Sequence, residues 1–166
     1  MQFASKIVPC IWFDNQGEEA ARYYVEIFPN SKIVDVTRYP EVGQEVHGQP
    51  AGKVLTVEFE LAGQRFTALN GGPHFKLSEA ISFQIMVDSQ EELDRYWNYL
   101  GQGGPVEAQQ CGWVKDKFGL SWQVVPTAMI AMLQDPDKAK VNRAFQAMLT
   151  MKKLDIAALQ RAFDGK

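Results

Sequence analysis

Glu18-Glu19-Ala20-Ala21-Arg22-Tyr23-Tyr24 and Glu91-Glu92-Leu93-Asp94-Arg95-Tyr96-Trp97 share the pattern Glu-Glu-x-x-Arg-Tyr-aromatic, 73 residues apart. Each stretch places apolar side chains at helical spacing and follows an apolar segment that ends in aspartate, Asp14 or Asp88. The pattern predicts two copies of one strand–helix–strands module. Chance likeness between two amphipathic helices with acidic first turns is the alternative.

The sequence around the first copy predicts a complete module. Asn15 followed by Glu18 fits a helix cap and its partner, and Pro29 ends the helical pattern. Alternation of polar and apolar residues predicts strands on both sides of the helix. The expected elements are a helix over 18–28 and strands over 6–13, 33–39, 54–61 and 65–69.

The second copy is followed by the same order of elements and then by a helical tail. Ser89 with Glu92 forms another capping pattern. The expected elements are strands over 81–87, 106–114 and 120–125 with a helix between the first two. In the tail, Thr127, Asp135 and Asp155 are expected to cap helices over 127–133, 136–150 and 156–163. The fold class is therefore α+β, in one domain over 1–166, with module one at about 1–75, module two at about 78–126 and the tail at about 127–166.

Composition excludes several classes of protein. The 166 residues are 46% hydrophobic and 22% charged, which is typical of a globular domain. A net charge of −3 without a basic run argues against nucleic-acid binding, and no apolar run is long enough to span a membrane. The N-terminus does not resemble a signal peptide, and Cys10 and Cys111 lack a CxxC partner. A cytoplasmic protein is expected.

Longer stretches of the chain resemble one known family. They are Trp12-Phe13-Asp14, Phe28-Pro29-Asn30-Ser31, Val57-Glu58-Phe59, Ala68-Leu69-Asn70-Gly71-Gly72-Pro73, Cys111-Gly112-Trp113, Asp116-x-Phe118-Gly119, Ser121-Trp122-Gln123-Val124-Val125-Pro126 and Met151-Lys152-Lys153-Leu154-Asp155. The sequence is similar to the PhnB-like family labelled "3-demethylubiquinone-9 3-methyltransferase", within the vicinal oxygen chelate (glyoxalase/bleomycin resistance/dioxygenase) superfamily. The resemblance implies two tandem βαβββ modules and a homodimer.

The resemblance also implies where a metal would lie, and this chain departs from that pattern. Metal-dependent relatives use histidine or glutamine and glutamate ligands, and the corresponding positions here are about Ile7, Ala68 or Asn70, Ser82 and Gln123. A serine hydroxyl with amides is a poor ligand set for a divalent metal. We therefore assign no cofactor. The alternative is a divalent metal bound by ligands at other positions. Common S-adenosylmethionine-dependent enzymes have a glycine-rich turn after their first strand. Residues 13–17, at the end of the first expected strand here, contain one glycine, so the sequence does not support the methyltransferase label.

Strand alternation predicts a polar-lined pocket. Ser82, Gln84 and Met86 are expected to share one face of their strand, and Ser121 and Gln123 to share a face of theirs. Polar side chains on otherwise apolar strands suggest a cavity, unless the amides only bond to one another or to water. The predicted lining is Trp12, Asn70, His74, Ser82, Gln84, Cys111, Trp113, Trp122 and Gln123.

The histidines and cysteines support no firm catalytic assignment. His47 lies in a long polar loop, either solvated or closing over a pocket. His74 follows Gly71-Gly72-Pro73 and is expected at the rim of the cavity, where it would serve as an acid or base or have no role. Cys111 would be a nucleophile only with a lowered pKa, and a small buried apolar role is preferred.

The sequence favours a homodimeric small-molecule-binding protein without the usual catalytic metal. The rival hypothesis is an enzyme, either a metal-dependent lyase, isomerase or dioxygenase or a methyltransferase acting on a demethylubiquinone-like substrate. A purely structural dimer is the third class. Neither the ligand nor a possible exchange of modules between subunits follows from the sequence.

Overall fold

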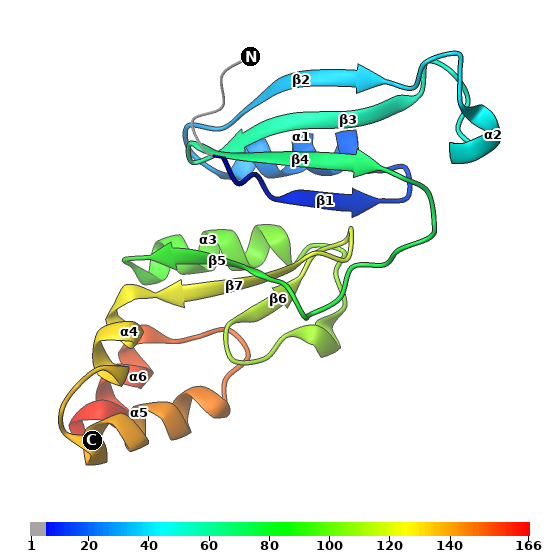
Figure 1. The fold of residues 1–166 in the computed structure, drawn as a ribbon. Helices are drawn as coiled ribbons and strands as arrows, with labels where there is room; N and C mark the ends of the chain where they lie inside the picture. Colours follow the sequence, from blue (N-terminus) through cyan, green and yellow to red (C-terminus); the bar gives the residue numbers. More distant parts are fainter. Residues whose placement is uncertain (1–5) are drawn as a thin grey trace. The chain divides into compact units, whose positions relative to one another are not determined.

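The computed structural model describes residues 6–166 and divides the chain into two compact units, Met1–Leu77 and Ser78–Lys166. We call them unit 1 and unit 2. Each contains one sheet with a helix against one face (Figure 1). The boundary falls between the two predicted modules.

Unit 1 has the order βαβαββ. Its elements are β1 (Cys10–Phe13), α1 (Gly17–Ile27), β2 (Lys32–Arg38), the short α2 (Gln44–His47), β3 (Val54–Leu61) and β4 (Gln64–Asn70). The strands lie in the order β1-β4-β3-β2, with β1 parallel to β4 and the other pairs antiparallel. The four strands expected in module one are all present.

The core of unit 1 lies between its sheet and α1. Alternate residues of β3 are buried, including Val57 and Phe59, and Tyr24 of α1 is buried against the same face. The remaining residues of β3 and β4 lie on the other face, where Arg65 forms ion pairs with Glu58 and Glu60. Period-two alternation thus separates an apolar helix-facing side from a charged side.

The start of α1 differs from the prediction. The cap position is Gln16 and not Asn15, and no side chain of this segment caps the helix. Instead the Gly17 amide donates a hydrogen bond of 2.7 Å to Asn70 Oδ1 at the end of β4. A carbonyl oxygen from a distant strand therefore satisfies a free amide of the first helical turn.

Unit 2 repeats the order with three strands and then adds three helices. Its elements are β5 (Phe83–Val87), α3 (Gln90–Leu100), a 3₁₀ turn (Val106–Ala108), β6 (Trp113–Lys115), β7 (Ser121–Pro126), α4 (Thr127–Leu133), α5 (Lys138–Leu149) and α6 (Ile156–Asp164). The strand order is β5-β7-β6, with β5 parallel and β6 antiparallel to β7. The α+β fold of two tandem modules followed by C-terminal helices is confirmed.

The strand expected over 106–114 is wrong over most of its length. Pro105 precedes the 3₁₀ turn, and Cys111 and Gly112 have φ values of +50° and +84°. Positive φ is incompatible with extended strand backbone. Only Trp113–Lys115 therefore pairs with β7.

Two of the four helix caps predicted for unit 2 are confirmed. Thr127 is not a cap: it is the first residue of α4, the cap position is Pro126, and no side chain caps this helix. Ser89 Oγ accepts a hydrogen bond of 3.1 Å from the Glu92 amide, which confirms the capping pattern of α3. Asp155 caps α6 as expected. For α5 the cap is Asp137 and not Asp135, since Asp135 instead accepts from the Asp137 amide in the preceding turn.

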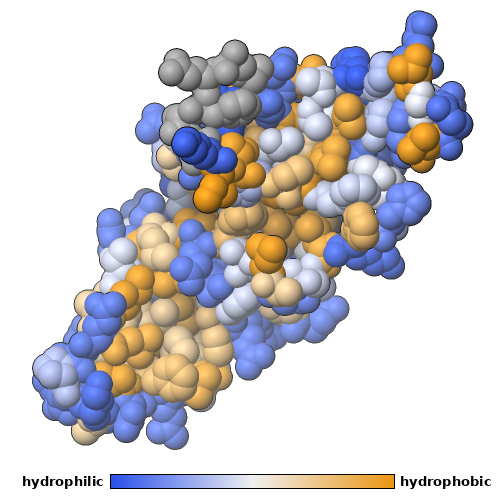
Figure 2. Space-filling view, in the orientation of Figure 1, coloured by the Kyte–Doolittle hydropathy of each residue, from blue (hydrophilic) through white to orange (hydrophobic). Residues whose placement is uncertain are grey.

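The C-terminal helices pack mainly on one another. Figure 2 shows apolar side chains gathered over this part of unit 2, where Phe145 and Leu149 are about half exposed. Among residues 6–166, none of the helices has both the length and the apolar character that crossing a membrane requires.

Candidate functional site

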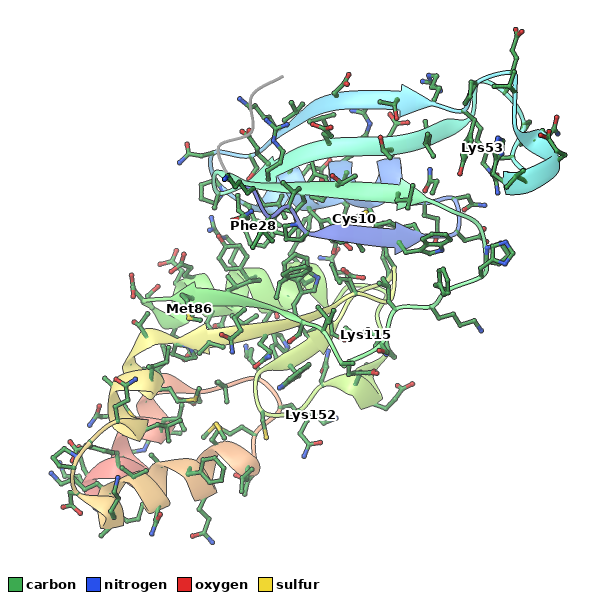
Figure 3. All side chains as sticks on the ribbon, viewed as in Figure 1. Cys10, Phe28, Lys53, Met86, Lys115 and Lys152 are labelled. Carbon is green, nitrogen blue, oxygen red and sulfur yellow. The ribbon has the colours of Figure 1, made fainter. Side chains whose placement is uncertain are left out.

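The site is built on the face of the unit 2 sheet that α3 does not cover, which we call the open face. Each strand directs an apolar side chain into the core beneath α3: Ile85 from β5, Val124 from β7 and Val114 from β6. Their strand neighbours therefore point to the open face. These are Gln84 and Met86 of β5, Ser121, Gln123 and Val125 of β7, and Trp113 and Lys115 of β6; Met86 and Lys115 are marked in Figure 3.

A row of polar side chains crosses the open face. Gln123 Nε2 donates a hydrogen bond of 2.7 Å to Ser82 Oγ, and Gln84 Nε2 donates at 3.4 Å to Gln123 Oε1. The strand register places Gln84 on one side of Gln123 and Trp113 on the other. The predicted shared face of Ser82, Gln84 and Gln123 is thus what the structure shows.

Ser121, two residues before Gln123, lies beside this row. The residue is 2% exposed, and its Oγ has no hydrogen-bond partner among the described residues. A buried hydroxyl without a partner costs free energy unless another group bonds to it. The Ser121 hydroxyl therefore has unused hydrogen-bonding capacity just beneath the open face.

A pocket of about 420 Å³ adjoins the row at Trp113. Its lining is Glu79, Glu107, Ala108, Gln110, Cys111 and Trp113. Lys115 forms an ion pair with Glu79. Hydrogen bonds that the Glu79 carboxylate accepts from Lys115 and from its own backbone N–H hold the pKa of that carboxyl below its ordinary value. The charge at this edge of the pocket is therefore compensated.

Cys111 lines the same pocket in an unusual backbone conformation. Its φ is +50°, and its amide donates a hydrogen bond of 2.8 Å to the Met151 carbonyl. The thiol is free and half-buried. The predicted neighbours Cys111 and Trp113 are thus brought together, whereas Glu79, Glu107 and Gln110 were missed because they lie in loops whose course depends on tertiary packing.

Trp12 and His74 of the predicted lining lie in unit 1, in a separate pocket of about 390 Å³. Its lining is Trp12, Tyr39, Val46, His47, Leu55, Leu69, Gly71 and His74. His74 is exposed at its rim, and the loop that carries His47 forms part of the wall. Of the two alternatives for His47, the structure therefore shows the pocket-lining one.

Asn70 and Trp122 form hydrogen bonds within the fold. Asn70 is 2% exposed; its Oδ1 accepts from the Gly17 amide and its Nδ2 donates to the Val54 carbonyl at 3.2 Å. Trp122 is 2% exposed on the α3 side of its sheet, and its Nε1 donates at 2.8 Å to Asp116. Both side chains belong to the cores of their units and not to an open face.

The positions that hold metal in vicinal oxygen chelate enzymes do not fit a divalent ion here. Ile7 and Ala68 have no donor side chain, and the Asn70 amide is already bonded on both atoms. Ser82 and Gln123 bond to each other. Within residues 6–166, no three His, Cys, Asp or Glu side chains come together as a metal site.

The chain is similar to several solved structures. The PhnB protein from Bacillus cereus is 29% identical with a TM-score of 0.65, and the match covers 74% of this chain and all of that one. Protein PA1353 from Pseudomonas aeruginosa is 22% identical, with a TM-score of 0.51 and 74% and 98% coverage. A glyoxylase/bleomycin resistance protein/dioxygenase domain from Frankia sp. is 14% identical, with a TM-score of 0.47 and 75% and 93% coverage.

None of the curated proteins compared with the chain matches it. A protein-family model described as 3-demethylubiquinone-9 3-methyltransferase matches residues 5–125, from before β1 to the last residue but one of β7. The chain belongs to this PhnB-like family.

Proposed function

We propose that the protein binds a small, uncharged polar molecule on the open face of unit 2 and in the adjoining pocket. The observation that carries the proposal is the polar row of Ser82, Gln123 and Gln84 beside the unpartnered Ser121 hydroxyl. Polar groups on a sheet face are usually saturated within the protein. Here they converge next to a tryptophan and a pocket of ligand size.

The chemistry of the lining selects the class of ligand. The two amides and two hydroxyls both donate and accept hydrogen bonds, so they suit carbonyl, amide or hydroxyl groups. Lys115 is already paired with Glu79, and Glu107 lines the same pocket, so the lining disfavours an anionic ligand. Trp113 offers a flat apolar surface for a ring or alkyl part.

Native mass spectrometry of protein purified without chelator or nickel tests this proposal directly. The expected spectrum is a homodimer that carries an organic adduct and no metal. One divalent ion per subunit would overturn the metal-free assignment. Binding of S-adenosylmethionine would instead favour the methyl transfer that the family description names.

Gln123→Ala is expected to weaken binding of the copurified molecule at least tenfold. The change removes the residue that bonds to both Ser82 and Gln84, while its half-exposed position leaves the core intact. Calorimetric titration of the released molecule against both proteins measures the effect. Gln160→Ala, an exposed glutamine of α6 with one side-chain hydrogen bond, is the matched control. Unchanged affinity in Gln123→Ala would refute the site.

Ser121→Ala is expected to act in opposite directions on stability and on binding. Removing a buried hydroxyl without a partner should raise the free energy of unfolding by about 1 kcal/mol. The same change should weaken ligand binding severalfold, because a bound molecule would lose a hydrogen bond. Urea unfolding without ligand and titration with it separate the two effects; a destabilised variant would show that Ser121 is bonded in the free protein.

A further inference from the structure

The pocket of unit 1 has a rigid aromatic wall. Trp12 Nε1 donates a hydrogen bond of 2.8 Å to the Gly72 carbonyl, and Phe75 packs edge-on with ring centroids 4.8 Å apart. A Cβ atom built on Gly71 would lie 2.2 Å from the Trp12 ring. The indole is therefore in close contact with the backbone of Gly71, and its orientation is fixed before any ligand arrives.

A second part of the lining is made by Tyr39 and His47. The Tyr39 hydroxyl donates to the Asn70 carbonyl at 2.7 Å, and its ring lies 4.6 Å from the His47 ring. His47 Nδ1 accepts from the Gln49 amide at 3.1 Å, so Nε2 carries the proton and faces the Val42 carbonyl at 3.3 Å. Both nitrogens of His47 are engaged, so His47 offers the pocket no free hydrogen-bonding atom.

His74 differs from the other polar residues of the lining. It is exposed at the rim, and the described residues provide no hydrogen bond to its ring. The Trp12 N–H and the Tyr39 hydroxyl already donate hydrogen bonds to backbone carbonyls. One hydrogen-bonding side chain, the imidazole of His74, is thus available to a ligand.

The lining excludes charged ligands. It contains no lysine, arginine, aspartate or glutamate. A carboxylate or ammonium group would lose hydration there without meeting an opposite charge. Val46 is 86% exposed and Leu55 and Leu69 are half-buried, so a flat apolar ring would cover apolar surface as it enters.

We infer that unit 1 has its own binding site for an uncharged aromatic compound of one or two rings with a single hydroxyl. The ring lies against Trp12 and the Tyr39–His47 part of the lining, and the hydroxyl bonds to His74. The volume of about 390 Å³ is at the small end of ligand pockets, which suits such a molecule. This site is separate from the one proposed in unit 2 and does not depend on it.

Calorimetric titration with 2-naphthol and 2-naphthoate tests the inference. In the Gln123→Ala background, which weakens the site proposed in unit 2, we expect 2-naphthol to bind once per chain and 2-naphthoate at least tenfold more weakly, because only the latter is charged. His74→Phe keeps a ring at the rim but removes the hydrogen bond, and should weaken 2-naphthol binding about threefold to tenfold. Gly71→Ala should weaken it at least tenfold by displacing Trp12.

Controls keep the outcome clear. Trp113→Phe alters the site proposed in unit 2 and should leave 2-naphthol binding unchanged, so the two sites fail independently. If Gly71→Ala does not fold by circular dichroism, the exposed His74→Phe variant still carries the test. Absence of 2-naphthol binding, equal affinity for 2-naphthoate, or full affinity in His74→Phe would each overturn the inference.

Discussion

Replacing Asp116 by alanine is expected to destabilise unit 2 by about 3 to 5 kcal/mol. The residue is 1% exposed, and its carboxylate accepts three hydrogen bonds. Oδ1 bonds to the amides of Phe118 and Leu120 at 2.9 and 3.1 Å, and Oδ2 to Trp122 Nε1 at 2.8 Å. Alanine would leave these donors without their acceptor in or near the core, which is among the costly classes of substitution.

Urea unfolding followed by tryptophan fluorescence measures this loss, because Trp122 is one of the donors. Asp116→Asn keeps one oxygen but places an amide nitrogen against the Trp122 N–H or the turn, so about 1 to 2 kcal/mol should be lost. Asp35→Ala, at an exposed position of β2, should stay within about 0.5 kcal/mol of the original protein. A loss below about 1 kcal/mol in Asp116→Ala would show that the turn does not depend on the carboxylate.

The same aspartate shows how far the sequence could predict the structure. The strands predicted over 106–114 and 120–125 leave a short connection between them, and residues 116–119 of that connection form a turn, because glycine and aspartate favour turns locally. That Asp116 also holds Trp122 in the core could not be predicted. Such a contact depends on how β7 lies beside the turn, which is a property of the tertiary structure.

The fold was predictable because its signals are local. The two helices begin at Gly17 and Gln90, which keeps the 73-residue offset of the repeat. Alternation placed the strands of unit 1 within a few residues, and Ser89 marked the start of α3. The predicted strand over 106–114 failed because apolar residues suggested extension, whereas the backbone at Cys111 and Gly112 has positive φ.

The candidate site was predictable only along single strands. Ser82, Gln84 and Gln123 share a face because side chains alternate with a period of two, which is independent of the rest of the fold. Asn70 was predicted as a lining residue, yet its amide is used by the start of α1. The shared pocket of His47 and His74 depends on the path of two loops, for which the sequence carries no periodic signal.

The connection between α5 and α6 attaches the C-terminal helices to the core of unit 2. The Leu154 carbonyl accepts a hydrogen bond of 3.2 Å from Gln90 Nε2, and Gln90 Oε1 accepts from the Ile156 amide at 2.9 Å. One side chain at the start of α3 therefore bonds to the chain on both sides of Asp155. Leu154 and Ile156 lie beyond the part matched by the family model, which ends at residue 125.

An ion pair next to this connection adds a pH dependence of definite sign. Hydrogen bonds from Lys153, at 2.7 Å, and from Gln90 hold the pKa of Asp94 below its ordinary value. A lowered pKa in the folded state adds stability above the ordinary carboxyl range, and that stability is lost as the pH falls through the folded value. Because both side chains are more than a third exposed, the contribution is below about 1 kcal/mol.

Leu154→Ala is expected to cost about 2 to 5 kcal/mol of unfolding free energy. The side chain is 1% exposed, and its Cδ1 would lie 3.0 Å from a Cβ built on Gly112, so it fills the space that this glycine leaves. Truncation removes buried methyl groups and leaves a cavity. Urea unfolding measures the loss, and Leu149→Ala, at a half-exposed leucine of α5, should change stability by no more than about 1 kcal/mol.

Hydrogen exchange then shows what the lost contact does to the structure. If Leu154 holds the C-terminal helices on unit 2, the amides of α5 and α6 should exchange faster in Leu154→Ala. The amides of Cys111 and Gly112 should also exchange faster, because they donate to the carbonyls of Met151 and Lys152. The amides of β3 in unit 1 should keep their protection. Equal loss of protection in both units would mean that Leu154 supports the whole chain, and unchanged protection in α6 would mean that α6 is held by other contacts.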